Sequence, residues 1–282
     1  MNKILVVALD LTDHDHTLIR YAKQLQSHYN IGHIHFIHNI KVSELDELLT
    51  EMLEDIQIAP IIQRNLEHKV QQIFHDETTY TLTLLEGDNT EFGINEWVKT
   101  HKETATILLG WKTAENGTGA MAQKLIRLSQ ADILLVPKEH TFAIERLLIP
   151  SDFSATFSKV KIKVEKLGAQ QVQVLKVYNI PSVFFPFIDD EATQLKAEKL
   201  AKTQYAEFSK KLNIPPTWQL KTQYRKEKSV ADIIARESRL FQANLVVLAA
   251  KGSNSIPSIF LGSTTNELIN KEPFHAAIYV VK

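Results

Sequence analysis

The sequence predicts an α/β chain made of two doubly wound, five-stranded parallel sheets, one in each half. The 282 residues are enough for about two domains of ~150 residues each. Short, continuous apolar runs alternate with segments of helical spacing, and such runs are typical of strands buried on both faces of a parallel sheet. Because parallel neighbours need crossover connections, this alternation predicts helices packed on both faces of each sheet.

The two halves repeat each other in the same order. An apolar run leads to Asp10 in the first half and to Asp152 in the second, and each is followed by an apolar residue and a hydroxyl residue. Two further pairs follow at similar offsets, 105–112 with 244–251 and 132–138 with 276–282. We therefore expect a duplicated unit of ~140 residues, the size of one domain, with domains at 1–140 and 144–282.

The apolar runs give the expected strands, and the segments between them give the helices. In the first unit the strands are expected at 3–9, 32–39, 79–85, 105–110 and 132–137. In the second they are expected at 146–150, 171–177, 218–224, 244–249 and 276–281, with helices near 154–167, 190–212, 229–241 and 262–270. The stripes Leu18–Leu25 and Leu45–Ile56 have the spacing of a core-facing helix side, and Ser43 and Ser229 are expected helix N-caps.

In a doubly wound sheet, ligands bind beyond the carboxyl ends of the strands, where the strand order reverses. Asp10 and Asp152 each follow the first strand of their unit. A carboxylate there can accept hydrogen bonds from a base amine or from ribose hydroxyls. The alternative for each is an N-cap of the next helix, a position where aspartate is preferred.

A glycine-containing loop follows the fourth strand of the second unit. Lys251 and Gly252 open this loop, and Gly262, Ser263 and Thr264 begin the next helix. Backbone amides at a helix start, with glycine and hydroxyls, suit phosphate, and Lys251 could add a cation. The alternative is a helix cap after an ordinary loop. The spacing matches neither a Walker loop nor a G-x-G-x-x-G fingerprint.

With these residues the chain resembles a tandem universal stress protein, with two family domains in one polypeptide. Nucleotide-binding members carry G-x2-G-x9-G-[S/T] after strand four, which Gly252 and Gly262-Ser263 fit, while Ala249 stands at the first glycine. The segment Pro150–Ser154 and the closing Val280-Val281-Lys282 are also typical of the family.

The resemblance implies a fold and a function. The fold is adenine nucleotide alpha hydrolase-like, with strand order 3-2-1-4-5 and with the two domains paired through their last strands, near 132–137 and 276–281, as a pseudo-twofold. The implied function is a stress-response regulatory protein that binds ATP, with Mg or Mn in some members, and that hydrolyses it slowly at most. Asp152 would contact the adenosine, and the backbone of Val177 would face the adenine. A homodimer is a further possible assembly.

The first unit departs from this pattern. Gly110 stands at the first glycine position and Gly119-Ala120 at the last pair, so the loop is shorter than in the second unit and lacks the closing hydroxyl. We therefore expect no ATP binding in the first unit, with Asp10 a remnant or a cap. In the second unit, Ala249 costs little if its φ is negative and much if the position needs a positive φ.

Histidines and phenylalanines supply the remaining candidates. His33 and His35 share one strand face, and imidazoles bind zinc, with His14 or His16 as further ligands; solvated histidines are the alternative. His38 faces the other way and is read as structural. The loop Val183–Phe187 could line a ligand pocket or a partner surface, or it could pack within its own domain.

Composition excludes several classes of function. The net charge is −1, without the basic excess of a nucleic-acid-binding protein. The absence of cysteine excludes disulfides, zinc thiolate sites and cysteine nucleophiles. No run reaches the ~18 apolar residues of a membrane span, and the first residues lack a signal-peptide pattern, so we expect a cytoplasmic protein.

Three readings of the function therefore stand. The first is a nucleotide-binding regulator that is not an enzyme. The second is a nucleotide-free module that recognises a protein or an apolar ligand through its paired domains or through Phe184–Phe187. The third, a hydrolase on the same fold, is disfavoured because no nucleophile elbow, metal triad or carboxylate pair stands out.

Overall fold

A computed structural model describes residues 4–41, 58–75, 79–101, 105–112, 118–180, 191–250, 262–271 and 274–282. The chain divides into two compact units, Met1–Phe142 and Ala143–Lys282. The division falls within the short polar connection at 139–145 that separates the two sequence repeats. The expected helix over Leu45–Ile56, with its cap Ser43, lies outside the described residues, as does the loop Val183–Phe187.

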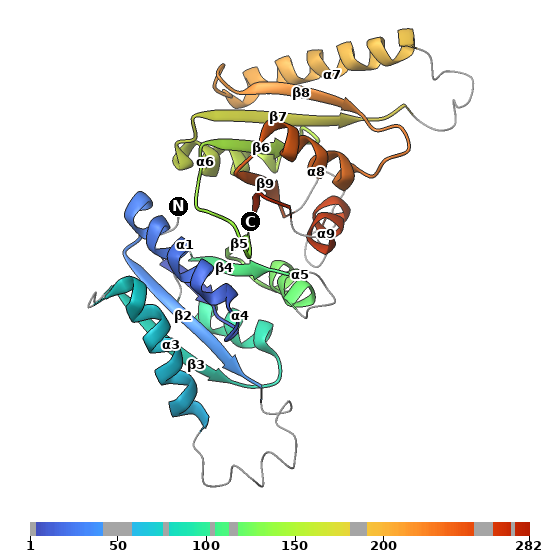
Figure 1. Cartoon of the computed structure of the whole chain (residues 1–282). Helices are drawn as coiled ribbons and strands as arrows, with labels where there is room; N and C mark the ends of the chain where they lie inside the picture. The colour runs from blue at the N-terminus through green and yellow to red at the C-terminus, as the bar shows by residue number, and fades with distance from the viewer. Residues whose placement is uncertain are drawn as a thin grey trace. The chain divides into compact units, whose positions relative to one another are not determined.

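Unit 1 is a five-stranded parallel sheet with helices on both faces (Figure 1). In chain order its described elements are β1 (Ile4–Ala8), α1 (His14–Tyr29), β2 (His33–Ile40), α3 (Ile58–Phe74), β3 (Tyr80–Glu86), α4 (Thr90–Thr100), β4 (Ala105–Trp111), α5 (Thr118–Leu128) and β5 (Asp132–Pro137). The strands lie in the order β3-β2-β1-β4-β5 and are all parallel. Helices α1 and α3 pack together, as do α4 and α5.

Unit 2 repeats this arrangement. Its described elements are β6 (Arg146–Pro150), α6 (Phe157–Leu167), β7 (Gln171–Tyr178), α7 (Glu191–Leu212), β8 (Gln219–Tyr224), α8 (Val230–Phe241), β9 (Leu245–Ala249), α9 (Ser263–Asn270) and β10 (Ala277–Val281). The order β8-β7-β6-β9-β10, again parallel, is the same 3-2-1-4-5 order. The predicted α/β class and the strand order within each unit are thus confirmed.

The strands form the core of each unit because their central residues are apolar on both faces. All six residues of β5 and all five of β10 are buried, and Leu147, Leu148 and Ile149 of β6 have no exposed surface. The edge strands β3 and β8 alternate with polar residues and are partly exposed. Every predicted strand ends within one residue of the observed one, since continuous apolar runs mark buried strands at both ends.

Two sequence-level expectations about helices are also confirmed. The stripe on α1 is core, with Leu18, Ile19, Ala22 and Leu25 buried. Ser229 caps α8, because its side chain accepts a hydrogen bond from the Asp232 backbone amide at 3.0 Å. Such a cap stabilises a helix by about 1 kcal/mol.

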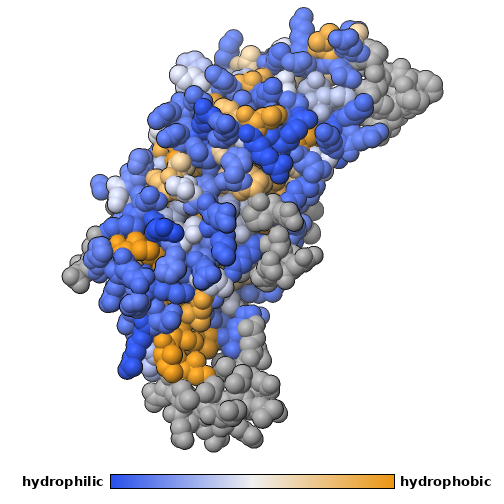
Figure 2. Space-filling model, viewed as in Figure 1, coloured by the Kyte–Doolittle hydropathy of each residue, from blue (hydrophilic) through white to orange (hydrophobic). Residues whose placement is uncertain are grey.

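The surface of the described residues is mostly polar. Figure 2 shows hydrophilic side chains over most of the viewed face, with apolar side chains in smaller patches on both units. Among the exposed apolar residues is Ile61 of α3, of which 56% is accessible. None of the helices in the described ranges is both long enough and apolar enough to cross a bilayer.

Candidate functional site

The strand order places one candidate binding edge in each unit. In unit 1 the order reverses between β1 and β4, and in unit 2 between β6 and β9. Crevices at such points, outside the carboxyl ends of the strands, are where ligands bind in this sheet type. Asp10 follows β1 and Asp152 follows β6, so each aspartate stands at the reversal point of its own unit.

The two aspartates close matching turns. Asp10 Oδ1 accepts the Thr12 amide at 3.2 Å, and Asp152 Oδ1 accepts the Ser154 amide at 3.0 Å. The intervening residues, Leu11 and Phe153, both have positive φ, 67° and 62°.

The alternative reading of both aspartates as helix N-caps is therefore wrong. The caps are Asp13 for α1 and Thr156 for α6, because the left-handed residue after each aspartate delays the start of the helix. Non-glycine residues rarely adopt this backbone, and it is concentrated at functional sites. Nothing in the residue types of Leu11 and Phe153 predicts it.

In unit 2 the turn is held by aromatic packing and by a lysine. The ring of Phe153 lies 5.1 Å from that of Phe208 and 5.7 Å from that of Tyr205, both on α7. Lys176, on β7, places its Nζ 4.5 Å from the Phe153 ring centre and donates to the Asp152 carbonyl at 3.3 Å. Burial lowers the pKa of Lys176, and the nearby Asp152 charge offsets part of this effect. These contacts hold the backbone that carries the Asp152 side chain.

The start of α9 is tied to the end of β9. The Gly262 amide donates to the Ala250 carbonyl at 3.2 Å, and Thr265 Oγ1 donates to the Ala249 carbonyl at 3.4 Å. The amides of the first helical turn have no acceptor within the helix, and Ser263 and Thr264 lie in this turn. Because β6 and β9 are paired, this positive helix end belongs to the same sheet edge as Asp152.

The other predicted site residues of unit 2 divide into two groups. Ala249 is the last residue of β9 and has no positive φ, so its backbone does not require glycine. Val177 lies near the carboxyl end of β7 and is half-buried. Lys251 and Gly252 lie outside the described residues. The structure thus brings Asp152, Val177, Ala249, Gly262, Ser263 and Thr264 to one edge of the sheet of unit 2.

The equivalent edge of unit 1 is filled by charged side chains of its own. Lys112, just after β4, pairs with Asp10 Oδ2. Burial alone would raise the pKa of Asp10, but the hydrogen bonds from Lys112 and Thr12 outweigh it and hold the pKa below its ordinary value. The negative charge of Asp10 is therefore neutralised by a lysine of the same unit.

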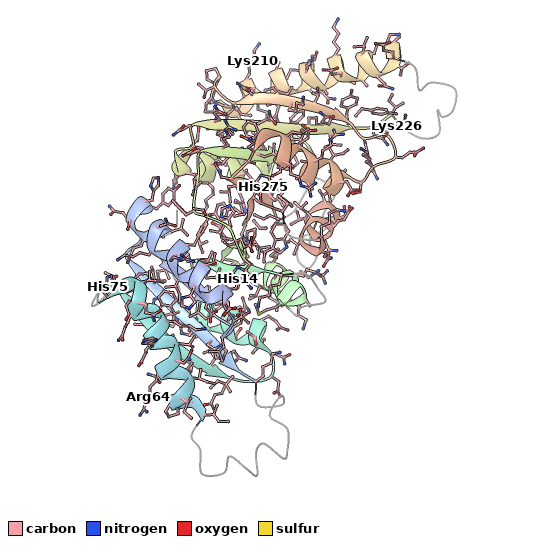
Figure 3. All side chains as sticks on the ribbon, viewed as in Figure 1. His14, Arg64, His75, Lys210, Lys226 and His275 are labelled. Atoms are coloured by element: carbon pink, nitrogen blue, oxygen red, sulfur yellow. The ribbon has the colours of Figure 1, made fainter. Side chains whose placement is uncertain are left out.

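His14 occupies the space over β4 in unit 1 (Figure 3). A Cβ added at Gly110 would lie 2.7 Å from His14 Nδ1 and 2.8 Å from Cε1. The imidazole is 2% exposed, and neither ring nitrogen has a hydrogen bond of good geometry in the described residues, although the Val136 and Pro137 carbonyls favour its charged form. The glycine at 110 thus makes room for His14. In unit 2, Ala249 stands at the position of Gly110, and Thr156 follows Asp152 at the spacing at which His14 follows Asp10.

A second, buried ion pair supports the turn of unit 1. Asp15 is fully buried, receives the Asp10 amide at 3.0 Å, and pairs with Lys69 Nζ of α3 at 3.1 Å. Burial raises the pKa of Asp15, and the bonds from Asp10 and Lys69 offset part of this rise. The sequence carries no signal for this pair, because its partners are 54 residues apart.

The buried His14 predicts an acid-sensitive unit 1. Burial, reinforced by the Lys112 charge, lowers the pKa of His14 below its ordinary 6.5. The unfolded chain therefore protonates His14 at a higher pH than the folded chain does. The free energy of unfolding of unit 1 then decreases as pH falls from about 6.5 toward the folded pKa of His14. We expect the His14 NMR resonances to titrate below pH 6.5, and a His14→Ser variant to lose stability less steeply on acidification. An unchanged slope would contradict this role.

Solved structures resemble the whole chain. No protein-family model and no curated protein matches it. A universal stress protein from Archaeoglobus fulgidus DSM 4304 aligns over 100% of this chain and 99% of its own, with 14% identity and a TM-score of 0.62. A functionally unknown protein from Pseudomonas aeruginosa PAO1 aligns over 100% and 92%, with 11% identity and a TM-score of 0.64. A candidate universal stress protein from Pseudomonas aeruginosa UCBPP-PA14 aligns over 99% and 92%, with 12% identity and a TM-score of 0.61.

This chain has the tandem universal stress protein fold. At these identities the likeness establishes the fold, and it does so over nearly the full length of each relative. The adenine nucleotide alpha hydrolase-like topology expected from the sequence is part of that fold.

The histidines of this universal stress protein fold lie in separate places. His38 Nδ1 donates to the Leu9 carbonyl at 2.9 Å and is buried, which agrees with a structural role. His33 and His35 lie at the start of β2, whereas His14 lies at the carboxyl end of the sheet beside Gly110. Besides His33, the histidine whose ring lies near that of His35 is His101, at the end of α4, and the two ring centres are 5.9 Å apart. The hypothesis that His14 completes a site with His33 and His35 is therefore wrong.

Proposed function

We propose that this chain is a cytoplasmic stress-response regulatory protein that binds ATP in unit 2. The observation that carries the proposal is the tethered start of α9, whose free amides share a sheet edge with the Asp152 turn. A positive helix end beside a carboxylate suits a ligand that has phosphates at one end and hydroxyls or an amine at the other. ATP is such a ligand.

Each residue of the edge would have a distinct role. The amides at Ser263 and Thr264 would hold phosphate oxygens, and Lys251 and Gly252 would extend this phosphate site. Gly262, whose own amide donates to the Ala250 carbonyl, would leave room for the phosphates because it has no side chain. Asp152 would accept the ribose hydroxyls, and the backbone of Val177 would face the adenine. Mg or Mn would accompany the phosphates. Ala249 supports the proposal because its negative φ places no glycine-only demand on β9.

We infer that unit 1 does not bind ATP and acts as the structural partner. His14 lies over β4 and Lys112 neutralises Asp10, whereas the residue at the same spacing after Asp152 in unit 2 is the smaller Thr156. The pairing of the units through their last strands, and a homodimer, remain part of this proposal as the means by which ATP would change an assembly. The chain is proposed to regulate rather than to catalyse, with slow hydrolysis at most.

Calorimetric titration of nucleotide-stripped protein with MgATP tests the proposal. We expect one ATP per chain, and no binding in Gly262→Val, because a branched side chain at the helix start would block phosphate. Gly262 has φ −55° and ψ 138°, a backbone that valine adopts, so the variant should fold. Lys124→Met, which removes an exposed lysine of unit 1, is the control and should leave stoichiometry and affinity unchanged.

Two results would overturn this reading. Binding of two ATP molecules per chain would contradict the inference that unit 1 does not bind ATP. An absence of heat up to about 1 mM ATP, the limit of weak specific binding, together with no nucleotide released from freshly purified protein, would reject the site in unit 2. The nucleotide-free interaction module would then be favoured, and partner capture with and without Phe184–Phe187 would be the next experiment.

A further inference from the structure

The start of β2 carries two histidines whose rings lean together. His33 and His35 are separated by one residue, so their side chains stand on the same face of the sheet. Their ring centres are 4.4 Å apart, shorter than the ~6.6 Å rise of two strand residues. This edge is at the amino ends of the strands in unit 1, away from the carboxyl edge that carries the turn of Asp10.

One nitrogen of each ring points at the same atom. His33 Nε2 lies 3.4 Å and His35 Nδ1 lies 2.6 Å from the Oγ1 of Thr81, on the neighbouring strand β3. A threonine hydroxyl has a single proton to donate, so it can donate to only one of the two imidazoles. Both nitrogens therefore face the same hydroxyl oxygen, and an ion bound between the two rings would replace these contacts with Thr81.

We propose that His33 Nε2 and His35 Nδ1 bind a divalent transition-metal ion on unit 1. Imidazole ligands suit Zn²⁺, Ni²⁺ and Cu²⁺, and Cu²⁺ forms the tightest complexes of this series. Within the described ranges no three His, Cys, Asp or Glu side chains are grouped to hold a metal, so water completes the coordination sphere. The site goes beyond the proposed nucleotide function. It lies at the amino ends of the strands of unit 1, whereas the nucleotide site is proposed at the carboxyl ends of the strands of unit 2.

Trp97 provides a reporter for this site. Its ring centre lies 4.5 Å from that of His35 and 3.7 Å from that of His101, on which it stacks. The other two tryptophans of the chain are Trp111, buried in β4, and Trp218, in unit 2. Because Cu²⁺ quenches nearby indoles, its binding at His35 should quench Trp97 in preference to the other two.

The test is a fluorescence titration of the full chain, without an added histidine tag, with CuCl₂. We expect saturable quenching at one ion per chain that is absent in Trp97→Phe. His35→Gln and His33→Gln should each weaken Cu²⁺ binding at least ~10-fold. Even the loss of a residue that only hydrogen-bonds to a metal ligand lowers metal affinity by that factor. Circular dichroism and thermal unfolding verify that each variant is folded.

His68→Gln is the matched control, because His68 is an exposed histidine on α3 of the same unit. It should bind Cu²⁺ as the natural sequence does. Quenching that does not saturate, or that persists with unchanged affinity in both His33→Gln and His35→Gln, would overturn the proposal. Since neither variant touches unit 2, failure here leaves MgATP binding as a separate question.

Discussion

Replacing Lys69 by methionine is expected to destabilise unit 1 by about 3 kcal/mol, the loss typical of breaking one side of a buried ion pair. Asp15 is fully buried and Lys69 is 16% exposed at the side chain, so the remaining carboxylate would be left charged within the protein. Methionine keeps the length and apolar character of the lysine stem, so the loss reflects the missing charge. Thermal unfolding should show the unit 1 transition lowered by about 10 °C.

The loss in Lys69→Met should depend on pH with a definite sign. Burial already raises the pKa of Asp15 with Lys69 present, and removing the ammonium should raise it further. As pH falls, the folded state takes up the Asp15 proton before the unfolded state does, so the deficit is largest at neutral pH and shrinks toward pH 4. A deficit that stays constant over this range would show that the charge of Asp15 is not its cause.

Lys124→Met is the matched control for this variant. Lys124 pairs with Glu91 at 2.7 Å, and the two side chains are 56% and 13% exposed. Because this lysine lies largely in water, the pair is expected to contribute less than about 1 kcal/mol. If both variants lose the same amount, burial does not distinguish the two pairs and the argument for Asp15 fails.

The sequence predicted the strands well because their signal is local. Buried parallel strands such as β5 are apolar at nearly every position, so their ends can be read from a few neighbouring residues. The Ser229 cap was predictable for the same reason, since its partner is three residues away. The repeat then transferred the strand order from one unit to the other.

The candidate site was predicted only in outline because its chemistry is not local. The sequence placed Asp10 and Asp152 after their strands, but the left-handed Leu11 and Phe153 between them and their hydroxyl partners have no residue-type signal. Lys69 reaches Asp15 from another helix, and Trp97 reaches His35 across 62 positions of chain. A glycine was visible at 110, but only the structure shows that an imidazole needs its space.

That glycine gives the second large prediction. Gly110→Ala should destabilise unit 1 by about 2 kcal/mol, within the range for overpacking a core, because the new Cβ would meet His14 Nδ1 at 2.7 Å and Cε1 at 2.8 Å. The backbone is not the obstacle, since Gly110 lies in a strand without a positive φ. His14 is 2% exposed, so its ring has little free space into which to rotate.

A double-mutant cycle separates this clash from any other effect of alanine. In a His14→Ala background the obstructing ring is gone, and Gly110→Ala should then be neutral or slightly stabilising, because alanine fits an extended strand about 0.5–1 kcal/mol better than glycine. Chemical denaturation of the four proteins gives the coupling energy, which we expect to be at least about 1.5 kcal/mol. If the losses of stability in the two single variants are additive, the His14 ring is not the reason that position 110 requires glycine. Strong coupling would explain why unit 1 has glycine where unit 2 has Ala249: in unit 1 the glycine makes room for the protein's own side chain rather than for a ligand.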